Sequence, residues 1–526
     1  MLFHSPLFIF GFLPLCFLGF VAVHRLWGWD AALLWLAGAS LVFYAQWSAA
    51  LAALLLGSIL FNYGAARLLL AKVDDRRTAR ALLLAAITAN LALLGYFKYA
   101  NFLIDNLNLL ADSALPHLDI LLPVGISFYT FVQIGFLVEV YNRQVRAIRF
   151  GHYLLFGSFF PCVTAGPIIL QKDMLPQFAR ARSATLDSTR IAVALTVFGI
   201  GLFKKLILAD NIAPFADGVF DGAAAGAPVG ATLAWIGALA YTLQLYFDFS
   251  AYSDMALGIG HLFGLQLPLN FNSPLKACSL VDFWRRWHMS MTRFFTGYLY
   301  PPIAMPLTRR ALQRSWSRTA RFLIATALPI TVTFVLAGLW HGAGWTFVVF
   351  GVIHGLALAV NHGWREARLP TLPPVAGWLL TMAVVIAGLV FFRAADVPTA
   401  LALLTSMAGL GPIEALHAVA WSPFGPGLGP SLGPAFPPDL ARVAIDVTAA
   451  LIWIVLLGAI ALICPNTQQL MSRHWFSSDP QPEDEHSWPR WLMWRPTLGW
   501  SLVGAILLAA ALGSISGESG FLYYQF

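Results

Sequence analysis

The sequence contains few charged residues. Only 11% of its 526 residues are Asp, Glu, Lys or Arg, whereas 59% are hydrophobic. Soluble domains carry about 25% charged residues, so this surplus of apolar side chains excludes a water-soluble protein and requires lipid as the solvent. Many apolar runs approach the ~20 residues that a helix needs to cross a bilayer. We therefore expect an all-α integral membrane protein that forms a single polytopic domain over residues 1–526.

The signatures of common soluble sites are also missing. Cys16, Cys162, Cys278 and Cys464 are scattered without metal-ligand spacing, which excludes a disulfide framework and a structural zinc site. The sequence has no GxSxG, P-loop, HExxH or GxGxxG motif. The net charge of +7 does not indicate nucleic-acid binding, because Lys and Arg cluster in short loops between apolar runs, as in cytoplasmic loops of membrane proteins. We expect no bound metal.

The apolar runs predict about twelve transmembrane helices. They lie near residues 6–24, 31–47, 49–71, 81–97, 119–141, 190–209, 231–249, 322–340, 343–362, 375–393, 440–464 and 496–514. The basic loops 72–80 and 142–149 are predicted to be cytoplasmic. Residues 98–118 between them are interpreted as an external interfacial helix, and residues 210–230, with aspartates but no Lys or Arg, as an external loop.

Two further regions are predicted to be re-entrant. Residues 152–170 contain Pro161, Gly166 and Pro167 and have basic residues on both sides. Region 265–321 likewise enters and returns to the cytoplasm. Irregular backbone at membrane depth is tolerated only where protein or water covers it, so these regions indicate a cavity open to the cytoplasm. We find no convincing internal repeat, which argues against transporters built from duplicated halves.

Two histidines lie where the bundle interior is expected. His341 is the centre of Gly338-Leu339-Trp340-His341-Gly342-Ala343-Gly344-Trp345, between two apolar runs. Ionisable residues at this depth usually face an interior or a wet cavity, and the glycines allow close approach of backbone or substrate. His288 falls on the apolar stripe of a helix predicted over residues 279–298, opposite Arg286 and Arg293. His354 and His362, on the arm after His341, are weaker candidates.

The histidine pair suits proton transfer without a metal. A neutral imidazole can take a proton from an acceptor hydroxyl near pH 7, although a packing histidine and a two-ligand metal site remain alternatives. A polar stretch, Tyr246 to Asp254, holds two acids, two tyrosines and two serines and is predicted to face the protein interior. We interpret Asp248 and Asp282 as structural partners rather than catalytic groups.

Two motifs contain the two histidines: Asp282-Phe283-Trp284-Arg285-Arg286-Trp287-His288-Met289-Ser290 and Trp340-His341-Gly342. Residues 123–128, 246–256 and 521–526 form supporting segments. Together these motifs resemble the membrane-bound O-acyltransferase family, and within it most closely the bacterial alginate O-acetylase branch. The match spans nearly the whole chain, with its motifs in residues 120–365.

The resemblance implies a function and a site. The family's near-invariant histidine corresponds to His341, and the second active-site histidine of the bacterial branch to His288. The helices would surround a central funnel and tunnel. A cytoplasmic thioester, acetyl-CoA or another, would donate the acyl group to a hydroxyl of a periplasmic partner protein or of an exopolysaccharide such as alginate. The protein would lie in the inner membrane of a bacterium, beside a polysaccharide-synthesis complex.

Three other functions stay open at this point. The same motifs suit D-alanyl transfer, as in teichoic acid synthesis. The polar residues would instead line a permeation path in a non-catalytic transporter or channel of polysaccharide export. A third alternative is a scaffold for the synthesis complex, which would tolerate loss of both histidines.

Overall fold

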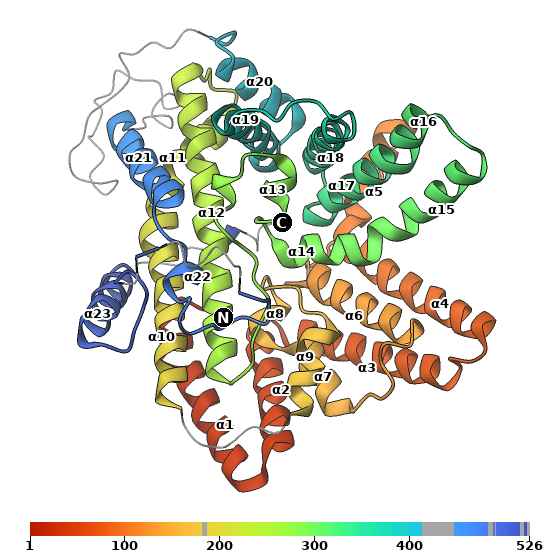
Figure 1. Ribbon diagram of the computed structural model, residues 1–526, viewed down its shortest axis with the longest axis vertical. Coiled ribbons are helices and arrows are strands. Elements are labelled where there is room, and N and C mark those ends of the chain that lie inside the picture. Colours follow the sequence, from red (N-terminus) through yellow and green to blue (C-terminus); the bar gives the residue numbers. More distant parts are fainter. Residues whose placement is uncertain (181–186, 413–445, 482–487, 490, 516–519, 523–526) are drawn as a thin grey trace. The chain divides into compact units, whose positions relative to one another are not determined.

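The computed structural model describes residues 1–180, 187–412, 446–481, 488–489, 491–515 and 520–522 (Figure 1). Residues 440–445 of the predicted run 440–464 and residues 523–526 of the segment 521–526 lie outside these ranges. Helices make up nearly all the regular structure of the described residues, and the one β-type contact among them is an isolated bridge between Leu267 and Ser477. The prediction of an all-α membrane protein is confirmed.

The described helices fall into two compact units. The first unit comprises residues 1–203, 251–270 and 467–526 and contains η1 (Leu7–Phe12), α1 (Leu13–Trp27), α2 (Trp29–Ala45), α3 (Ala49–Ala71), α4 (Arg76–Leu94), η2 (Gly95–Tyr99), α5 (Ala100–Ala111), α6 (Ile126–Tyr141), α7 (Phe150–Ser158), α8 (Phe160–Val163), α9 (Gln171–Ala179), α10 (Ser188–Phe203), α22 (Thr467–Leu470) and α23 (Leu498–Gly513). The second unit comprises residues 204–250 and 271–466 and contains η3 (Lys204–Ala209), α11 (Asp210–Ala224), η4 (Pro274–Lys276), α13 (Leu280–Trp284), α14 (Met289–Phe294), η5 (Phe295–Leu299), α15 (Tyr300–Gln313), α16 (Arg318–Phe322), η6 (Leu323–Ala327), α17 (Leu328–His341), α18 (Trp345–Glu366), α19 (Pro374–Arg393), α20 (Val397–Met407) and α21 (Val447–Ile463). Helix α12 (Ala231–Leu262) contributes to both units. Whether the chain forms the single domain that we expect stays a prediction.

Seven helical segments are long and apolar enough to cross a membrane. They are Leu7–Trp27, Ala49–Ala71, Arg76–Ala111, Ser188–Ala224, Arg318–His341, Trp345–Glu366 and Pro374–Arg393. Five shorter apolar helices, α2, α6, α20, α21 and α23, accompany them. The predicted count of about twelve spans is therefore not confirmed. Predicted run 231–249 lies in the 32-residue helix α12 but is not among the seven segments.

Two local predictions are wrong. Residues 210–224 form helix α11 rather than an external loop, because Ile212, Ala216, Val219 and Phe220 recur at helical spacing and are buried. Residues 279–298 do not form one helix. They form α13 and α14, with His288 between them in a left-handed conformation at φ 42°. A periodicity of 100° per residue cannot reveal such a break, since the apolar residues on both sides are buried anyway.

Run 152–170 does not contain a spanning helix. It holds α7, with nine residues, and α8, with four, and Pro161 lies in the first turn of α8. Neither helix approaches the ~20 residues of a span. Since Phe156, Phe159 and Phe160 are buried, protein covers this irregular backbone. This agrees with the physical reason given for a re-entrant segment, but the direction of entry stays a prediction.

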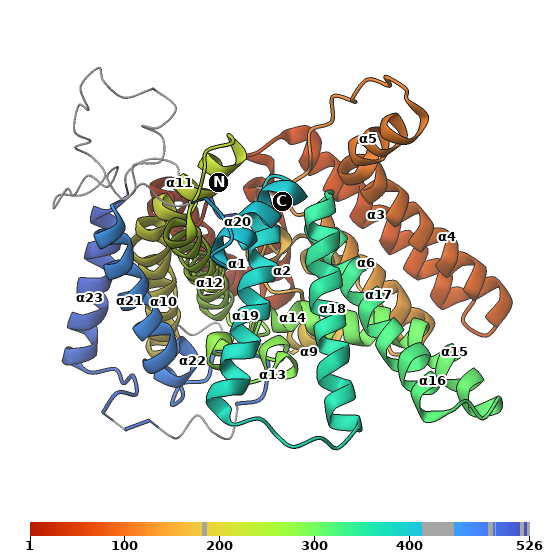
Figure 2. The same cartoon turned by 90° about the horizontal axis from the view of Figure 1, so that it is seen from above.

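Within the first unit, a polar pair ties α3 to α4, which lie side by side in Figures 1 and 2. The buried amides of Asn62 and Asn90 donate to each other's carbonyl oxygens, at 2.9 Å and 2.8 Å. In an apolar environment both amides need such partners, because an unpaired buried polar group is costly. The reciprocal pair therefore fixes which faces of α3 and α4 meet.

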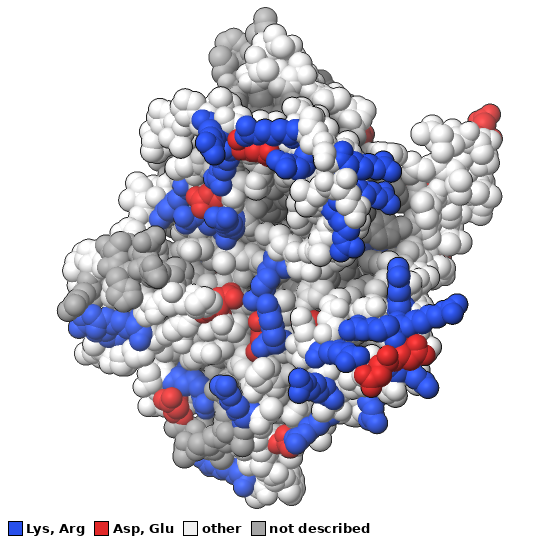
Figure 3. Space-filling model, turned by 45° about the vertical axis from the view of Figure 1, so that its right-hand side comes forward, with Lys and Arg blue, Asp and Glu red and all other residues white. Residues whose placement is uncertain are grey.

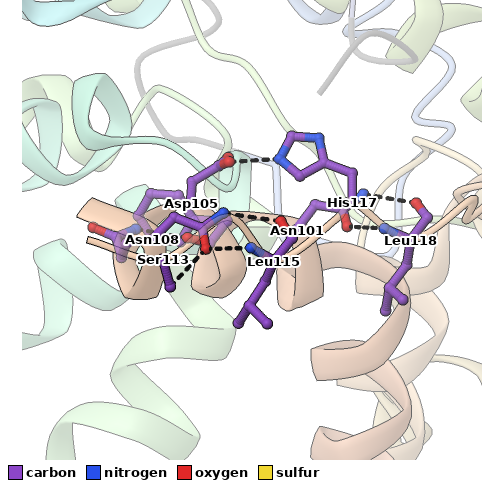
Figure 4. Close-up of polar contacts among 9 residues, drawn as sticks. Asn101, Asp105, Asn108, Ser113, Leu115, His117 and Leu118 are labelled. Atoms are coloured by element: carbon purple, nitrogen blue, oxygen red, sulfur yellow. Dashed lines mark hydrogen bonds and ion pairs between the residues drawn. The ribbon is translucent and has the colours of Figure 1, made fainter. Parts of the chain in front are cut away.

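Helix α5 lies within residues 98–118, for which an interfacial helix is predicted, and exposes Leu103, Leu107 and Leu110 at helical spacing. Its position relative to a membrane stays a prediction. Its polar face is covered by the following segment (Figure 4). Asn108 Oδ1 accepts hydrogen bonds from the Leu115 amide and the Ser113 hydroxyl, at 2.8 Å and 2.9 Å. His117 and Asp105 contact each other at 2.5 Å. The exposed leucines are suited to the apolar side of a membrane interface.

Basic side chains are exposed on the second unit around α15 and α16. Arg309, Arg310, Arg314, Arg318 and Arg321 are all exposed, and residues 300–321 contain no Asp or Glu. Figure 3 shows more Lys and Arg than Asp and Glu on the face that it presents. This distribution is typical of a cytoplasmic loop.

Helices α17 and α18 pack backbone against backbone (Figure 2). A Cβ on Gly338 would lie 2.1 Å from the Phe347 carbonyl oxygen, and one on Gly351 would lie 2.4 Å from the Phe334 carbonyl oxygen. No real Cβ approaches a backbone atom so closely, so only glycine fits at both positions. This contact sets the position of the C-terminal end of α17, where His341 lies.

Replacing Gly338 by alanine should therefore separate α17 from α18. We expect Gly338→Ala to destabilise the protein by about 1–3 kcal/mol, the typical cost of overpacking, and to lower its thermal midpoint in detergent. Gly458→Ala in α21 is the control, because nothing lies within 4 Å of a Cβ there. Equal midpoints for the two variants would contradict the close packing.

Candidate functional site

His341 is the last residue of α17, and only 6% of its surface is exposed. The chain leaves the helix at Gly342 in an extended conformation, at φ −158° and ψ 151°. A Cβ on Gly342 would lie 2.0 Å from the ring of Phe347, whereas one on Gly344 would meet only ordinary contacts. Gly338 and Gly342 thus allow α18 to approach on both sides of His341, as expected from the sequence.

His288 is completely buried and adopts a left-handed backbone, with φ 42° and ψ 54°. A non-glycine residue in this region is uncommon and carries strain of order 1–3 kcal/mol. The surroundings hold the turn. The Ser279 hydroxyl caps α13 by accepting from the Asp282 amide, and Arg286 Nε donates to Asp282 Oδ1 at 2.8 Å. Asp282 therefore has a structural role in this turn, as we expected of a carboxylate beside an arginine.

The turn is also tied to its neighbours in the second unit. The backbone N–H of Asn272 donates to the backbone carbonyl oxygen of Arg286 at 2.9 Å. The Val281 amide donates to Asn361 Oδ1 on α18, at 3.3 Å. These hydrogen bonds hold the turn from both sides, and they maintain the strained backbone conformation of His288.

The two imidazoles that the sequence singled out lie close together. Their ring centroids are 6.4 Å apart, and the ring of Trp340 packs against both, at 6.0 Å from His288 and 4.9 Å from His341. Each imidazole also has a ring partner of its own. Phe249 on α12 lies 4.8 Å from His288, and Phe392 on α19 lies 5.1 Å from His341.

The two rings are too far apart for a direct hydrogen bond. The nitrogen atoms of two directly hydrogen-bonded imidazoles lie about 3 Å apart, which requires ring centres closer than 6.4 Å. His288 lies outside the seven candidate spans, and its burial disfavours the charged imidazolium and lowers its pKa to about 3. A neutral ring with a low pKa is a weak base but can hold or orient a hydrogen-bonded partner.

A third imidazole, that of His354 on α18, is buried one layer away. Phe350 contacts both histidines of this hairpin, at 6.1 Å from His341 and 4.6 Å from His354. Trp284 lies 5.2 Å from His354. Among the described residues, neither ring nitrogen of His354 has a hydrogen-bond partner. No ring contact joins His354 to His341 or His288 in the described part of the chain, so we keep it outside the candidate site.

The polar stretch Tyr246 to Asp254 is buried, as predicted. In the second unit Asp248 accepts from Lys205 Nζ at 2.8 Å, and in the first unit Asp254 accepts from Thr467 at 2.7 Å. Asp248 is thus a structural partner. The sequence interpretation missed Lys205, although a lysine inside apolar run 190–209 is itself a signal, since ionisable groups are rare at membrane depth.

The described residues contain no group of three or more His, Cys, Asp or Glu side chains that could hold a metal ion. Zinc sites in proteins use at least three protein ligands, and His288 and His341 supply two.

The left-handed conformation of His288 gives a testable consequence for stability. Asparagine tolerates this conformation, whereas a β-branched residue does not. We expect His288→Asn to keep a thermal midpoint near that of the parent protein and His288→Val to be less stable by about 1–3 kcal/mol. Thermal unfolding of the purified variants in detergent measures both. A His288→Asn variant as unstable as His288→Val would show that the backbone there is not left-handed.

Comparisons with known proteins show the family of the chain. The sequence profile of the membrane-bound O-acyltransferase family (MBOAT) matches residues 137–397. This range includes both histidines and the helices that carry their ring partners. A peptidoglycan O-acetyltransferase of Helicobacter pylori is 39% identical over 447 residues, which cover 79% of this chain and 81% of that protein.

Two further relatives show the breadth of the similarity. A probable alginate O-acetylase AlgI of Azotobacter vinelandii is 38% identical over 78% of this chain and 79% of its own length. A teichoic acid D-alanyltransferase of Streptococcus thermophilus is 26% identical over 47% of this chain and 58% of its own length. Together with the seven candidate spans, these similarities show that the chain is a multi-pass membrane O-acyltransferase and belongs to the alginate O-acetylase-like branch of the membrane-bound O-acyltransferase family.

Proposed function

We propose that this enzyme passes an acetyl group from a cytoplasmic thioester, acetyl-CoA or another, to a hydroxyl acceptor on the opposite side of a bacterial inner membrane. The observation that carries the proposal is the pair of buried imidazoles, His288 and His341, with ring centroids 6.4 Å apart. At this distance the two rings do not hydrogen-bond directly to each other, and aromatic rings pack against both.

The residues have distinct roles in this proposal. His341 takes the proton of the acceptor hydroxyl as its oxygen attacks the thioester carbonyl. The carbon–sulfur bond of the resulting intermediate then breaks, and the thiolate receives the proton back from His341. No net proton is consumed. His288, neutral because of its burial, orients the acceptor or shares its hydrogen bond.

The relatives support a polysaccharide context for the acceptor. The names of the Helicobacter pylori and Azotobacter vinelandii relatives refer to acetylation of peptidoglycan and of alginate, respectively. We infer that the hydroxyl belongs to a bacterial polysaccharide, or to a periplasmic partner protein that completes the transfer to it. D-alanyl transfer is less well supported, because the D-alanyltransferase relative is similar over less than half of this chain.

The decisive variant is His341→Ala. We expect it to lower the rate of acetyl-ester formation by roughly 10²- to 10⁴-fold, the usual contribution of a general base. The assay supplies acetyl-CoA labelled in its acetyl group to membranes that contain the protein and its acceptor, and it measures alkali-labile label in the polymer. D-alanyl thioester, supplied in parallel, should give no transfer.

His362→Ala is the matched control, because His362 lies on α18 of the same hairpin and is only partly buried. It should keep nearly full activity at an equal protein level. Full activity of His341→Ala would refute the catalytic role of His341, and transfer from the D-alanyl donor instead would refute the acetyl donor.

A further inference from the structure

Each imidazole of the candidate site packs against an aromatic ring whose neighbour in sequence forms a charged contact. Phe249, beside His288, follows Asp248 on α12. Phe392, beside His341, precedes Arg393 at the end of α19. All of these residues belong to the second unit. The ring partner of each histidine is therefore next in sequence to a residue of an ion-pair cluster: Asp248 belongs to a cluster at Lys205, and Arg393 is the centre of a second cluster.

The first cluster lies at Lys205. Its side chain is 2% exposed, and its Nζ lies 2.8 Å from Asp248 Oδ1 and 2.8 Å from Asp210 Oδ1. Asp248 is itself 3% exposed. A buried charge that loses its partner is strongly unfavourable, so Asp248 must keep facing Lys205. Successive residues of an α-helix are separated by a fixed rotation. The ion pair therefore also fixes the direction in which Phe249 points.

The second cluster lies at Arg393. Its Nη2 donates to Asp217 Oδ1 at 2.8 Å and to Asp221 Oδ1 at 3.1 Å, two carboxylates one turn apart on α11. The guanidinium also lies over the ring of Phe220, 5.6 Å from its centroid. The Arg393 side chain is 21% exposed. These contacts bind the end of α19 to α11 and so hold Phe392 in place beside His341.

We propose that Lys205 and Arg393 are positioning residues for the acyl-transfer reaction. Lys205 acts on His288 through Asp248 and Phe249, and Arg393 acts on His341 through Phe392. Neither contacts the reacting groups. The inference rests on the proposed function of the two histidines, because it concerns their placement. A displacement of about 1 Å at a reacting group can cost on the order of 100-fold in rate, so loss of either cluster should reduce turnover.

Arg393→Gln is the first test, because its partly exposed side chain makes misfolding less of a risk than at Lys205. We expect kcat to fall roughly 10- to 100-fold, while KM for acetyl-CoA stays within about twofold. Arg393→Lys, which keeps the charge beside Asp217, should restore part of kcat. Arg318→Gln is the matched control. It breaks an ion pair with Glu366 in the same unit, away from the candidate site, and should leave kcat unchanged.

A double-mutant cycle separates positioning from general destabilisation. Phe392→Leu removes the ring through which Arg393 acts, so adding Arg393→Gln to it should lower kcat by no more than about threefold further. Phe249→Leu with Lys205→Gln forms the second cycle. Multiplicative losses in the Arg393 cycle, or an unchanged kcat in Arg393→Gln, would overturn the proposal.

The outcome is distinguishable from failure of the proposed function. If His341→Ala abolishes transfer while Arg393→Gln and Lys205→Gln do not reduce kcat, the positioning proposal is wrong and the catalytic one stands. If His341→Ala keeps full activity, the proposed catalytic role of His341 is wrong, whatever the Arg393 and Lys205 variants show.

Discussion

The close contact between α17 and α18 is the constraint on which the site depends. Glycines at 338, 351 and 355 bring the two helix backbones together, since a Cβ at each would collide with backbone atoms of the opposite helix. An apolar environment offers no hydrophobic gain for helix association, so small residues and tight packing hold membrane helices together. His341 lies at the C-terminal end of α17, beside this contact. The packing of the hairpin therefore determines where the imidazole of His341 is held.

The site combines this rigid hairpin with a strained turn. His288 adopts a left-handed backbone between two short helices, and Asp282, Arg286 and Asn272 hold the turn. Strained backbone that its surroundings maintain is often found at functional sites. Aromatic rings pack against both buried imidazoles, and burial strengthens the electrostatic interactions inside a site. One short turn and one helix end thus bring the two imidazole rings to a centroid distance of 6.4 Å.

The sequence predicted the helices for which hydropathy is decisive, such as α3, α17, α18 and α19, and it singled out both histidines because ionisable residues are rare in such surroundings. It could not predict the turn at His288, since apolar residues on both sides of the break are buried and their periodicity is uninterrupted. It misjudged α11, because an absence of Lys and Arg indicates the side of a membrane, not the conformation of the chain. Lys205 escaped notice as a single residue in an apolar run, and its partner Asp248 is 43 residues away.

The central claim is that the imidazole of His341 accepts the proton of the acyl acceptor. Chemical rescue tests it most directly: free imidazole is added to the purified His341→Gly variant, and the rate of acetyl-ester formation is measured. The account predicts that imidazole restores a measurable part of the rate of His341→Gly in a concentration-dependent manner. It predicts no restoration in a double variant in which His288 is changed to Gly and His341 is replaced as well. A His341→Gly variant that retains the full rate without added imidazole would contradict the account.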